Sequence, residues 1–379
     1  MRPYGLILAG GGAKGAYQIG AWKAMREMNI EFEAIAGVSI GAINGALIAG
    51  GDFDDALELW SNVEVSSGVN LSSELKDPSN LFSFSNFPQL IHEFVRKGGV
   101  DVTPARELIG KHIDETAVRN SNIPLGIVTF DLSEFKPVEM FVNEMPEGEL
   151  LDYLMASARV PGLNKQGPEG GSYLDGGVYD NAPVGILRKR GINRLIIVDI
   201  SNIKGIGHKQ DLSCADVIYI RPFDAKELGE SFEFDKTMTE KRITMGYLDT
   251  KKAFGFLGGQ FYYFLPREFK ALSAHFGFDT VDELENLALE YGLERLKVYT
   301  ERQFLRALKT TIKDKNNAAF ENSEKDVEAK EQIRVRGEEP FFLKKIQESS
   351  QELLKRFSVR SKLKKYPKAA EVLENLETK

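Results

Sequence analysis

Residues 4–22 read YGLILAGGGAKGAYQIGAW, and this stretch decides the fold class. A short apolar run, 4–9, meets three consecutive glycines, and apolar side chains recur at helical spacing after them. A second apolar run, 32–37, passes through the turn GVSIG into a stretch of small residues that suits another helix. This alternation of strands and helices predicts an α/β protein with a mostly parallel sheet.

The same alternation continues to about residue 225. Further strands are expected at 123–132, 136–142, 194–201 and 216–222, with helices at 89–97, 103–112 and 147–160 and a loop or cap over 68–88. Beyond residue 223 the pattern is mainly helical and heavily charged, without clear strands. We therefore expect two parts, a domain over 1–225 and a mainly helical C-terminal region over 226–379.

The composition is that of a globular protein, since 42% of the 379 residues are apolar and 28% are charged. The single cysteine, Cys214, excludes an internal disulfide. No secretory signal and no apolar stretch of about 18 residues is visible, so we expect a cytoplasmic protein without a membrane-spanning helix. We expect no metal and no nucleic-acid partner, and the oligomeric state is left open.

A serine stands in the second turn. The segment AGVSIGA, 36–42, matches the pattern G-x-S-x-G, in which a sharp strand-to-helix turn lifts a serine above the sheet. Gly37 and Gly41 would provide the room, because a side chain at either position would collide where strand and helix approach each other. Ser39 would then stand at a helix N-terminus, where free N–H groups favour developing negative charge. We interpret Ser39 as a nucleophile.

A serine nucleophile needs a base, and the chain offers two kinds. Four histidines are candidates: His92, His112, His208 and His275. Of these, His208 follows Asp175 in the chain and so fits the order Ser, Asp, His of α/β-hydrolases. Asp175 itself is the other candidate, because a short strand delivers it into Gly176 and Gly177, which turn the backbone without covering the carboxylate.

The glycine loop, 10–15, also fits a dinucleotide-binding turn, which would make the protein an oxidoreductase. Such a site needs an acidic residue about 20 residues further on, at the end of the second strand, to hold a ribose. Glu31 and Glu33 are in range, but they precede or begin that strand. Ser39 takes the position where this acidic residue would stand, which favours a hydrolase over an oxidoreductase.

In a hydrolase the loop would form an oxyanion hole beside the serine turn. Free N–H groups would come from three glycines: Gly10, Gly11 and Gly12. Lys14 would add positive charge. These groups would stabilise the negative oxygen that forms when Ser39 attacks a carbonyl carbon.

Three motifs in this order, GGGAKG (10–15), GVSIG (37–41) and DGG (175–177), resemble those of the patatin-like phospholipases. The segment ASARVP (156–161) agrees with the resemblance, which covers about residues 4–222. It implies a three-layer α/β/α fold and hydrolysis of fatty-acyl esters of phospholipids or lysophospholipids without a cofactor.

For individual residues, the resemblance implies a catalytic dyad of Ser39 and Asp175 with no histidine. It places the oxyanion hole in the 10–15 loop, with Gly10, Gly11, Gly12, Lys14 and Gly15 as its residues. A lipid-binding protein that kept the fold without turnover is a further alternative, although intact Ser39 and Asp175 argue against it.

The charge is unevenly distributed, since the net charge is −7 while residues 301–379 hold 19 Lys and Arg against 14 Asp and Glu. Within this part, 341–368 is a basic amphipathic segment that we expect to be helical and able to lie on an anionic membrane. An aromatic segment, 258–269, fits either a lipid entrance or core packing.

Overall fold

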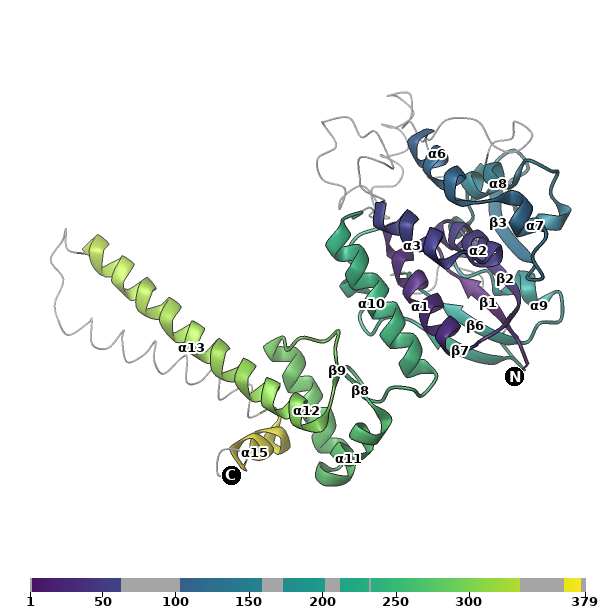
Figure 1. The fold of residues 1–379 in the computed structure, drawn as a ribbon. Coiled ribbons are helices and arrows are strands. Elements are labelled where there is room, and N and C mark those ends of the chain that lie inside the picture. The colour runs from purple at the N-terminus through teal and green to yellow at the C-terminus, as the bar shows by residue number, and fades with distance from the viewer. Residues whose placement is uncertain are drawn as a thin grey trace. The chain divides into compact units, whose positions relative to one another are not determined.

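The computed structural model describes residues 2–62, 103–158, 173–201, 212–231, 233–334 and 365–375. The chain divides into two compact units, Met1–Phe254 and Gly255–Lys379 (Figure 1). The segments 68–88 and 89–97 lie outside the described residues, as do residues 341–364 of the basic segment 341–368. In the part of the chain that is described, no helix is both long and apolar enough to cross a bilayer.

The first unit is built on a seven-stranded sheet in the order β4-β3-β2-β1-β6-β7, with β5 pairing with β3. The strands β1, β2, β3, β6 and β7 run parallel, whereas β4 and β5 are antiparallel to β3. Their bounds are β1 Tyr4–Leu8, β2 Phe32–Val38, β3 Leu125–Asp131, β4 Lys136–Phe141, β5 Tyr173–Asp175, β6 Arg194–Val198 and β7 Asp216–Ile220. The mostly parallel sheet expected from the sequence is confirmed.

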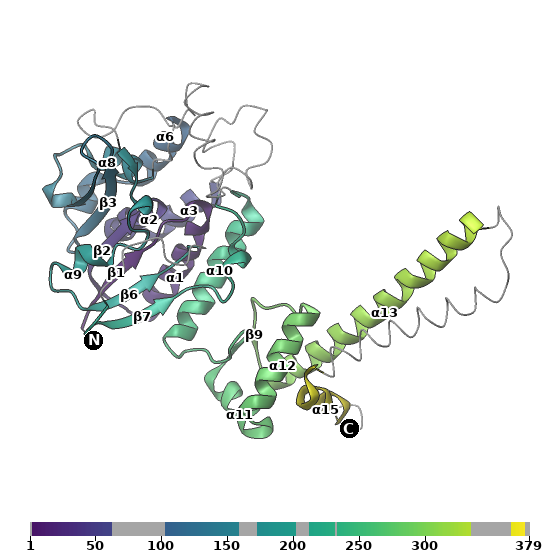
Figure 2. The same ribbon diagram turned by 180° about the vertical axis from the view of Figure 1, so that it is seen from behind.

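Helices cover both faces of this sheet (Figure 2). They are α1 Ala16–Glu27, α2 Ile40–Gly50, α3 Phe53–Asn62, α6 Thr103–His112, α7 Glu115–Arg119, α8 Leu150–Ser157, α9 Val184–Arg188 and α10 Lys236–Ala253. On one face, the side chains of Leu8 and Ile35 approach Gly45 of α2. On the other, Ile7 and Ala36 pack in one cluster with three residues of α9, Val184, Ile186 and Leu187. The fold therefore has the three layers that were expected.

Helix α10 belongs to the first unit, because it crosses α1 at backbone contact. A side chain on Gly20 would lie 1.9 Å from the Ile243 carbonyl oxygen, and one on Gly246 would lie 1.9 Å from that of Tyr17. Only glycines allow the two helices to approach so closely. The unit thus extends to residue 254, beyond the boundary near 225 that the change of composition indicated.

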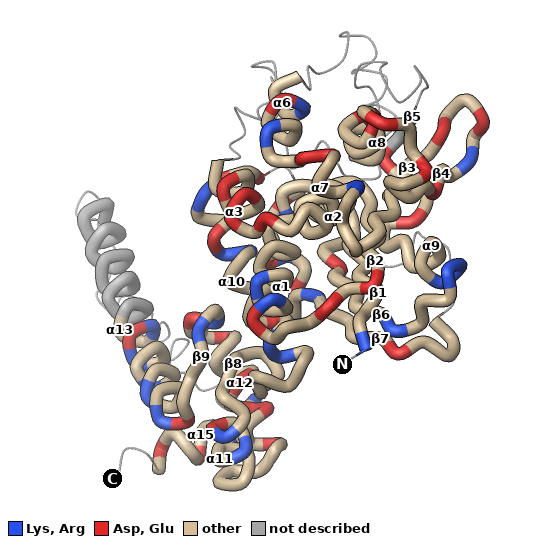
Figure 3. The backbone as a smooth tube through the Cα atoms, turned by 45° about the vertical axis from the view of Figure 1, so that its right-hand side comes forward, with Lys and Arg blue, Asp and Glu red and all other residues tan. Residues whose placement is uncertain are grey.

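The second unit is mainly helical, with α11 Pro266–Phe276, α12 Phe278–Tyr291, α13 Glu301–Arg334 and α15 Pro367–Asn375. Contrary to the expectation of no strands, it contains a short parallel pair, β8 Tyr263–Phe264 and β9 Val298–Tyr299. The aromatic segment lies in its core, where Tyr262, Phe264 and Phe304 are fully buried. Figure 3 shows Lys and Arg positions along the first turns of α13. Arg302 and Arg306, in the first two turns of this helix, are exposed.

Candidate active site

Ser39 stands in a sharp turn between β2 and α2. Its backbone has φ 56 and ψ −130, a strained conformation for a residue with a side chain. A side chain on Gly37 would lie 2.3 Å from the Gly41 carbonyl oxygen, and one on Gly41 would lie 2.2 Å from that of Leu8. Both glycines therefore have the steric role expected from the sequence, and Ser39 occupies the N-cap position of α2.

The strand register explains how Asp175 reaches this turn. Strand β2 ends at Val38, which lies opposite Val128, but β3 continues for three more residues. The edge of β3 that β2 leaves open is taken by β5, which runs in the opposite direction and pairs Asp175 with Thr129. The last residue of β5 is therefore delivered directly beside the end of β2.

The Ser39 side chain lies beside the Asp175 carboxylate and acts on its pKa as a hydrogen-bond partner. Burial raises the pKa of Asp175 from 3.8 to about 6, while the hydrogen bonds from Ser39 and from the Gly177 N–H act in the opposite direction. The Gly177 N–H donates to Asp175 Oδ1 at 2.8 Å. A carboxylate of this basicity beside a serine hydroxyl is suited to accept its proton near neutral pH.

Glycines keep the aspartate turn close to the sheet and to the glycine loop. A side chain on Gly176 would lie 2.4 Å from the Val128 carbonyl oxygen, and one on Gly177 would lie 2.6 Å from Asn181 Oδ1. Asn181 also reaches Gly10, because its side-chain amide donates to the Gly10 carbonyl at 3.2 Å. The sequence indicated only a turn role for Asn181, and its partner became visible only in the fold.

The Gly10 N–H is not free, which corrects one expectation. It donates to the Asn181 carbonyl at 3.2 Å, closing a two-way link between the glycine loop and the aspartate turn. The N–H groups of Gly11 and Gly12 have no hydrogen-bond partner among the described residues. Gly10 itself touches the serine turn, since a side chain there would lie 3.1 Å from Ser39 Cβ. Two unpaired amides thus follow a residue in contact with Ser39.

The far side of the loop is closed by the segment before α10. Gly12 has φ +59, and a side chain there would lie 2.2 Å from the Ser231 carbonyl oxygen, which accepts the Ala13 N–H at 2.7 Å. This segment is held by Arg242 of α10, a fully buried residue. Its guanidinium donates to the carbonyls of Leu228, Glu230 and Glu233.

The remaining two loop residues face inward. Lys14 is 4% exposed, and burial lowers the pKa of its ammonium group, with the nearby Glu230 opposing this shift. Gly15 has a packing role, because a side chain there would lie within 3 Å of Ile40 and Trp60. The ring of Trp60 lies where that side chain would be.

Two buried polar residues support the site and were not predicted from the sequence. The Ser157 hydroxyl of α8 accepts the Ser39 N–H at 2.9 Å and donates to the Val128 carbonyl at 2.6 Å. Asn44 of α2 donates to the Gly15 carbonyl at 3.0 Å and to the Gln18 side chain at 2.8 Å. The segment ASARVP contains Ser157, so the motif pointed to this region of the chain. The sequence did not show that Ser157 would contact Ser39.

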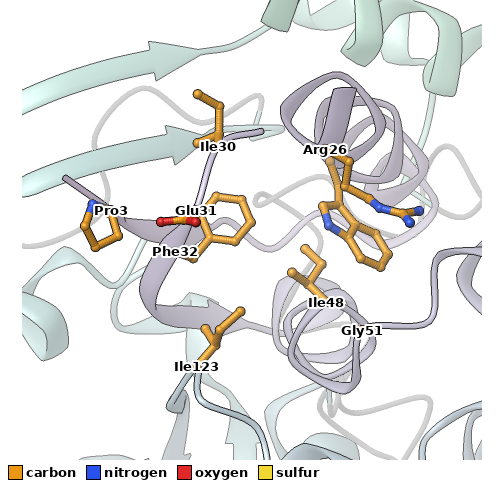
Figure 4. Close-up of a pocket in the computed structure, with 9 residues that line it drawn as sticks. Pro3, Arg26, Ile30, Glu31, Phe32, Ile48, Gly51 and Ile123 are labelled. Atoms are coloured by element: carbon orange, nitrogen blue, oxygen red, sulfur yellow. The ribbon is translucent and has the colours of Figure 1, made fainter. Parts of the chain in front are cut away.

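The surroundings of the loop do not favour a dinucleotide. Ser231 and Asn181 occupy the space against Gly12 and Gly10, where a pyrophosphate would have to approach. Glu31 lies at the amino end of β2, opposite to the end that carries Ser39. Figure 4 shows it there, in an open pocket of about 450 Å³ that is lined also by Pro3 and Phe32.

Each of the two described histidines lies beside a carboxylate other than that of Asp175. His112 lies 3.6 Å from Asp55, and His275 lies 2.9 Å from Glu301. His92 and His208 lie outside the described residues, so a triad through His208 stays a prediction.

Residues 6–188 match the model of a family described as patatin-like phospholipase. Lysophospholipase NTE1 of Cryptococcus neoformans var. neoformans serotype D (strain JEC21 / ATCC MYA-565) is 28% identical over 303 residues, covering 78% of this chain and 17% of that protein. Lysophospholipase NTE1 of Saccharomyces cerevisiae is 28% identical over 205 residues, covering 52% of this chain and 11% of that protein. The chain thus spans less than a fifth of the length of these curated relatives.

Solved structures with a similar arrangement are more distant. The crystal structure of VipD from Legionella pneumophila aligns with 90% of this chain and 89% of its own, at a TM-score of 0.36 and 14% identity. That of the type III effector protein ExoU aligns with 82% of this chain and 69% of its own, at a TM-score of 0.32 and 14% identity.

Proposed function

Residues 6–188 match the model of the patatin-like phospholipase family, and on this premise we propose that the protein is a serine acyl-hydrolase that cleaves fatty-acyl esters of phospholipids or lysophospholipids. The observation that carries the proposal is the position of the Asp175 carboxylate beside Ser39, which acts on its pKa as a hydrogen-bond partner. The serine of a strained turn thus stands next to a carboxylate whose pKa is raised to about 6 by burial.

In the first half of the reaction, Ser39 Oγ attacks the ester carbonyl carbon and its proton passes to Asp175. The carbonyl oxygen becomes negatively charged and accepts hydrogen bonds from the unpaired N–H groups of Gly11 and Gly12. When the tetrahedral intermediate collapses, the bond to the alcohol breaks, and Asp175 returns the proton to the leaving oxygen.

In the second half, a water molecule attacks the acyl-enzyme and Asp175 accepts its proton. The same amides stabilise the second oxyanion, after which the fatty acid leaves and Ser39 regains its proton. One carboxylate thus acts alternately as base and acid, without a metal or a histidine in the proposed scheme.

The substrate class is proposed from the family and from the relatives named lysophospholipase. Hydrolysis of monoacyl and of diacyl glycerophospholipids would distinguish lysophospholipase from phospholipase A activity. A protein that binds lipid without turnover would bind both substrates and release no fatty acid from either.

The test compares the wild type with Ser39→Ala and Asp175→Asn on a water-soluble acyl ester and on both lipid classes. We expect each substitution to lower kcat by about 10³-fold or more. The chain offers a matched control pair in Asp199 and Ser201, which also form a carboxylate–hydroxyl hydrogen bond, at 2.6 Å. Asp199→Asn and Ser201→Ala should leave hydrolysis within about twofold of the wild type.

A further inference from the structure

The loop that joins β3 and β4 exposes two large apolar side chains. Phe135 is 79% exposed and Leu132 is 39% exposed, and every residue from 132 to 136 is at the surface. A phenylalanine in water at a loop tip has a hydration cost that burial in an apolar phase would remove. We call residues 132–135 the hairpin tip.

The backbone of the hairpin tip holds Phe135 in this position at a cost. Phe135 has φ 52, in the left-handed region that favours glycine or asparagine and disfavours a bulky residue. Asp131 fixes the turn, since its carboxylate accepts the N–H groups of Ser133 and Glu134 at 2.7 and 3.2 Å. A glycine at position 135 would relieve the strain, so the ring is present for a reason other than the turn itself.

The hairpin tip lies at the same edge of the sheet as the proposed dyad. Asp175 is paired with Thr129, and Leu132 is three residues further along the chain. At about 3.3 Å per strand residue, the tip lies roughly 10 Å beyond the level of Asp175. Figure 3 shows this loop projecting from the sheet, with both acidic and basic positions along it.

Aromatic rings connect the hairpin tip to the aspartate turn. The ring of Phe135 packs edge-on against Phe130, with centroids 5.3 Å apart, and Phe130 lies 6.5 Å from the ring of Tyr179. Tyr179 follows the Asp-Gly-Gly turn closely in the chain. Phe130 itself lies opposite Leu174, the residue before Asp175, so an apolar phase that receives Phe135 would reach the strand that carries Asp175.

We infer that the hairpin tip inserts into the surface of a zwitterionic phospholipid aggregate and places the proposed active site at that surface. The inference rests on the proposed function, because a lipid hydrolase meets its substrate in bilayers or micelles. The charges beside the tip, Asp131, Glu134 and Lys136, sum to −1, which gives no attraction to an anionic surface. Glu134 and Lys136 form an ion pair, so the remaining negative charge is that of Asp131, whose carboxylate accepts two backbone N–H groups of the turn.

A second copy of the chain is a less suitable binding partner for the hairpin tip than a lipid surface is. A stable protein interface buries at least about 1,200 Å² in total, far more than two side chains at one loop provide. Insertion into a lipid surface needs no such area, because each apolar side chain contributes independently.

The test uses the full chain with Ser39→Ala as background, so that lipid is not consumed. Partition onto phosphatidylcholine vesicles, and onto vesicles that also contain phosphatidylglycerol, is measured by sedimentation for this protein and for one that also carries Leu132→Ser and Phe135→Gly. A glycine suits the left-handed backbone at position 135, so the variant keeps its fold. A matched control carries Phe278→Ser, which removes a phenylalanine 73% exposed on α12.

The hairpin variant should lose about tenfold or more in vesicle partition, and the Phe278 variant should not. When Ser39 is restored in the hairpin variant, the hydrolysis of vesicle lipid by this variant should fall by a similar factor relative to its hydrolysis of a water-soluble ester. Wild-type partition in the hairpin variant, or a loss confined to vesicles containing phosphatidylglycerol, would overturn the inference. Absence of all ester hydrolysis would instead count against the proposed function, since the partition measurement does not depend on turnover.

Discussion

The Ser157 hydroxyl accepts the backbone N–H of Ser39 at 2.9 Å and donates its own hydrogen to the Val128 carbonyl at 2.6 Å. One side chain thus links the serine turn to β3, the strand that also pairs with β5, whose last residue is Asp175. Ser157 is fully buried, so its hydroxyl holds both backbone groups away from bulk solvent. Its proposed role is to position Ser39 rather than to react.

Ser157→Ala should therefore lower both stability and activity. Two buried backbone groups lose their partner, which costs about 2 kcal/mol of unfolding free energy. The loosened turn should lower kcat by about 10- to 100-fold with little change in KM. Ser273→Ala is the matched control, because the Ser273 hydroxyl is buried and has no hydrogen-bond partner among the described residues. An equal effect of the two substitutions on kcat would contradict a positioning role for Ser157.

Gly12→Ala should abolish most activity by displacing the glycine loop. The new methyl group would lie 2.2 Å from the Ser231 carbonyl oxygen, at a backbone φ of +59. If the Gly12 N–H moves out of the oxyanion hole, kcat should fall by about 10²- to 10³-fold. Ester hydrolysis by the purified variant measures this fall.

Gly191→Ala is the control for backbone strain alone. Gly191 has φ +79, and a side chain there meets nothing within 4 Å. It should cost about 1–2 kcal/mol of stability and leave kcat unchanged. Similar losses of kcat in both variants would mean that the close contact with Ser231 is irrelevant to catalysis.

The pH dependence of activity should follow the titration of Asp175. Burial raises the pKa of its carboxyl to about 6 in the free enzyme, and only the ionised form accepts the Ser39 proton. The value of kcat/KM should therefore be constant above about pH 7 and decline tenfold per pH unit well below pH 6. Hydrolysis of a water-soluble ester between pH 4 and 9 measures this decline in kcat/KM. A decline centred near pH 4 would contradict a raised pKa of the Asp175 carboxyl.

The same raised pKa predicts that Asp175→Asn stabilises the fold at neutral pH. The folded protein binds the Asp175 proton more tightly than the unfolded chain does. This difference adds to the free energy of unfolding below about pH 4, and the added stability is lost as the pH rises through about 6. Two pKa units correspond to about 3 kcal/mol as an upper limit. Denaturant unfolding at pH 7.5 and at pH 4 should give a stabilisation by Asp175→Asn that is larger at pH 7.5. A variant less stable than the wild type at pH 7.5 would contradict this.

The parts of the site that depend on local backbone sterics were predictable from the sequence. Gly37 and Gly41 are required because a strand and a helix that are adjacent in the chain approach each other closely. The steric reason for both glycines can therefore be inferred from the local sequence alone. The strained backbone at Ser39 follows from the same turn. The order of strands and glycine turns was likewise sufficient to predict a mostly parallel α/β sheet.

The parts that depend on distant segments were not predictable. The Gly10 N–H is occupied because Asn181 folds back on it, and nothing near Gly10 in the chain indicates this. Helix α10 belongs to the first unit because Gly246 meets α1, although the composition changes before it. Partners of this kind are set by tertiary packing, which propensity and periodicity do not contain.

The central claim is that Ser39 is the nucleophile and Asp175 its base, and covalent labelling tests it most directly. The purified protein is treated with a fluorophosphonate probe, digested, and analysed by mass spectrometry to locate the modified serine. We expect a single modified peptide containing Ser39, with labelling slowed by about 10²-fold or more in Asp175→Asn. Modification at another serine, or unchanged labelling in Asp175→Asn, would contradict it.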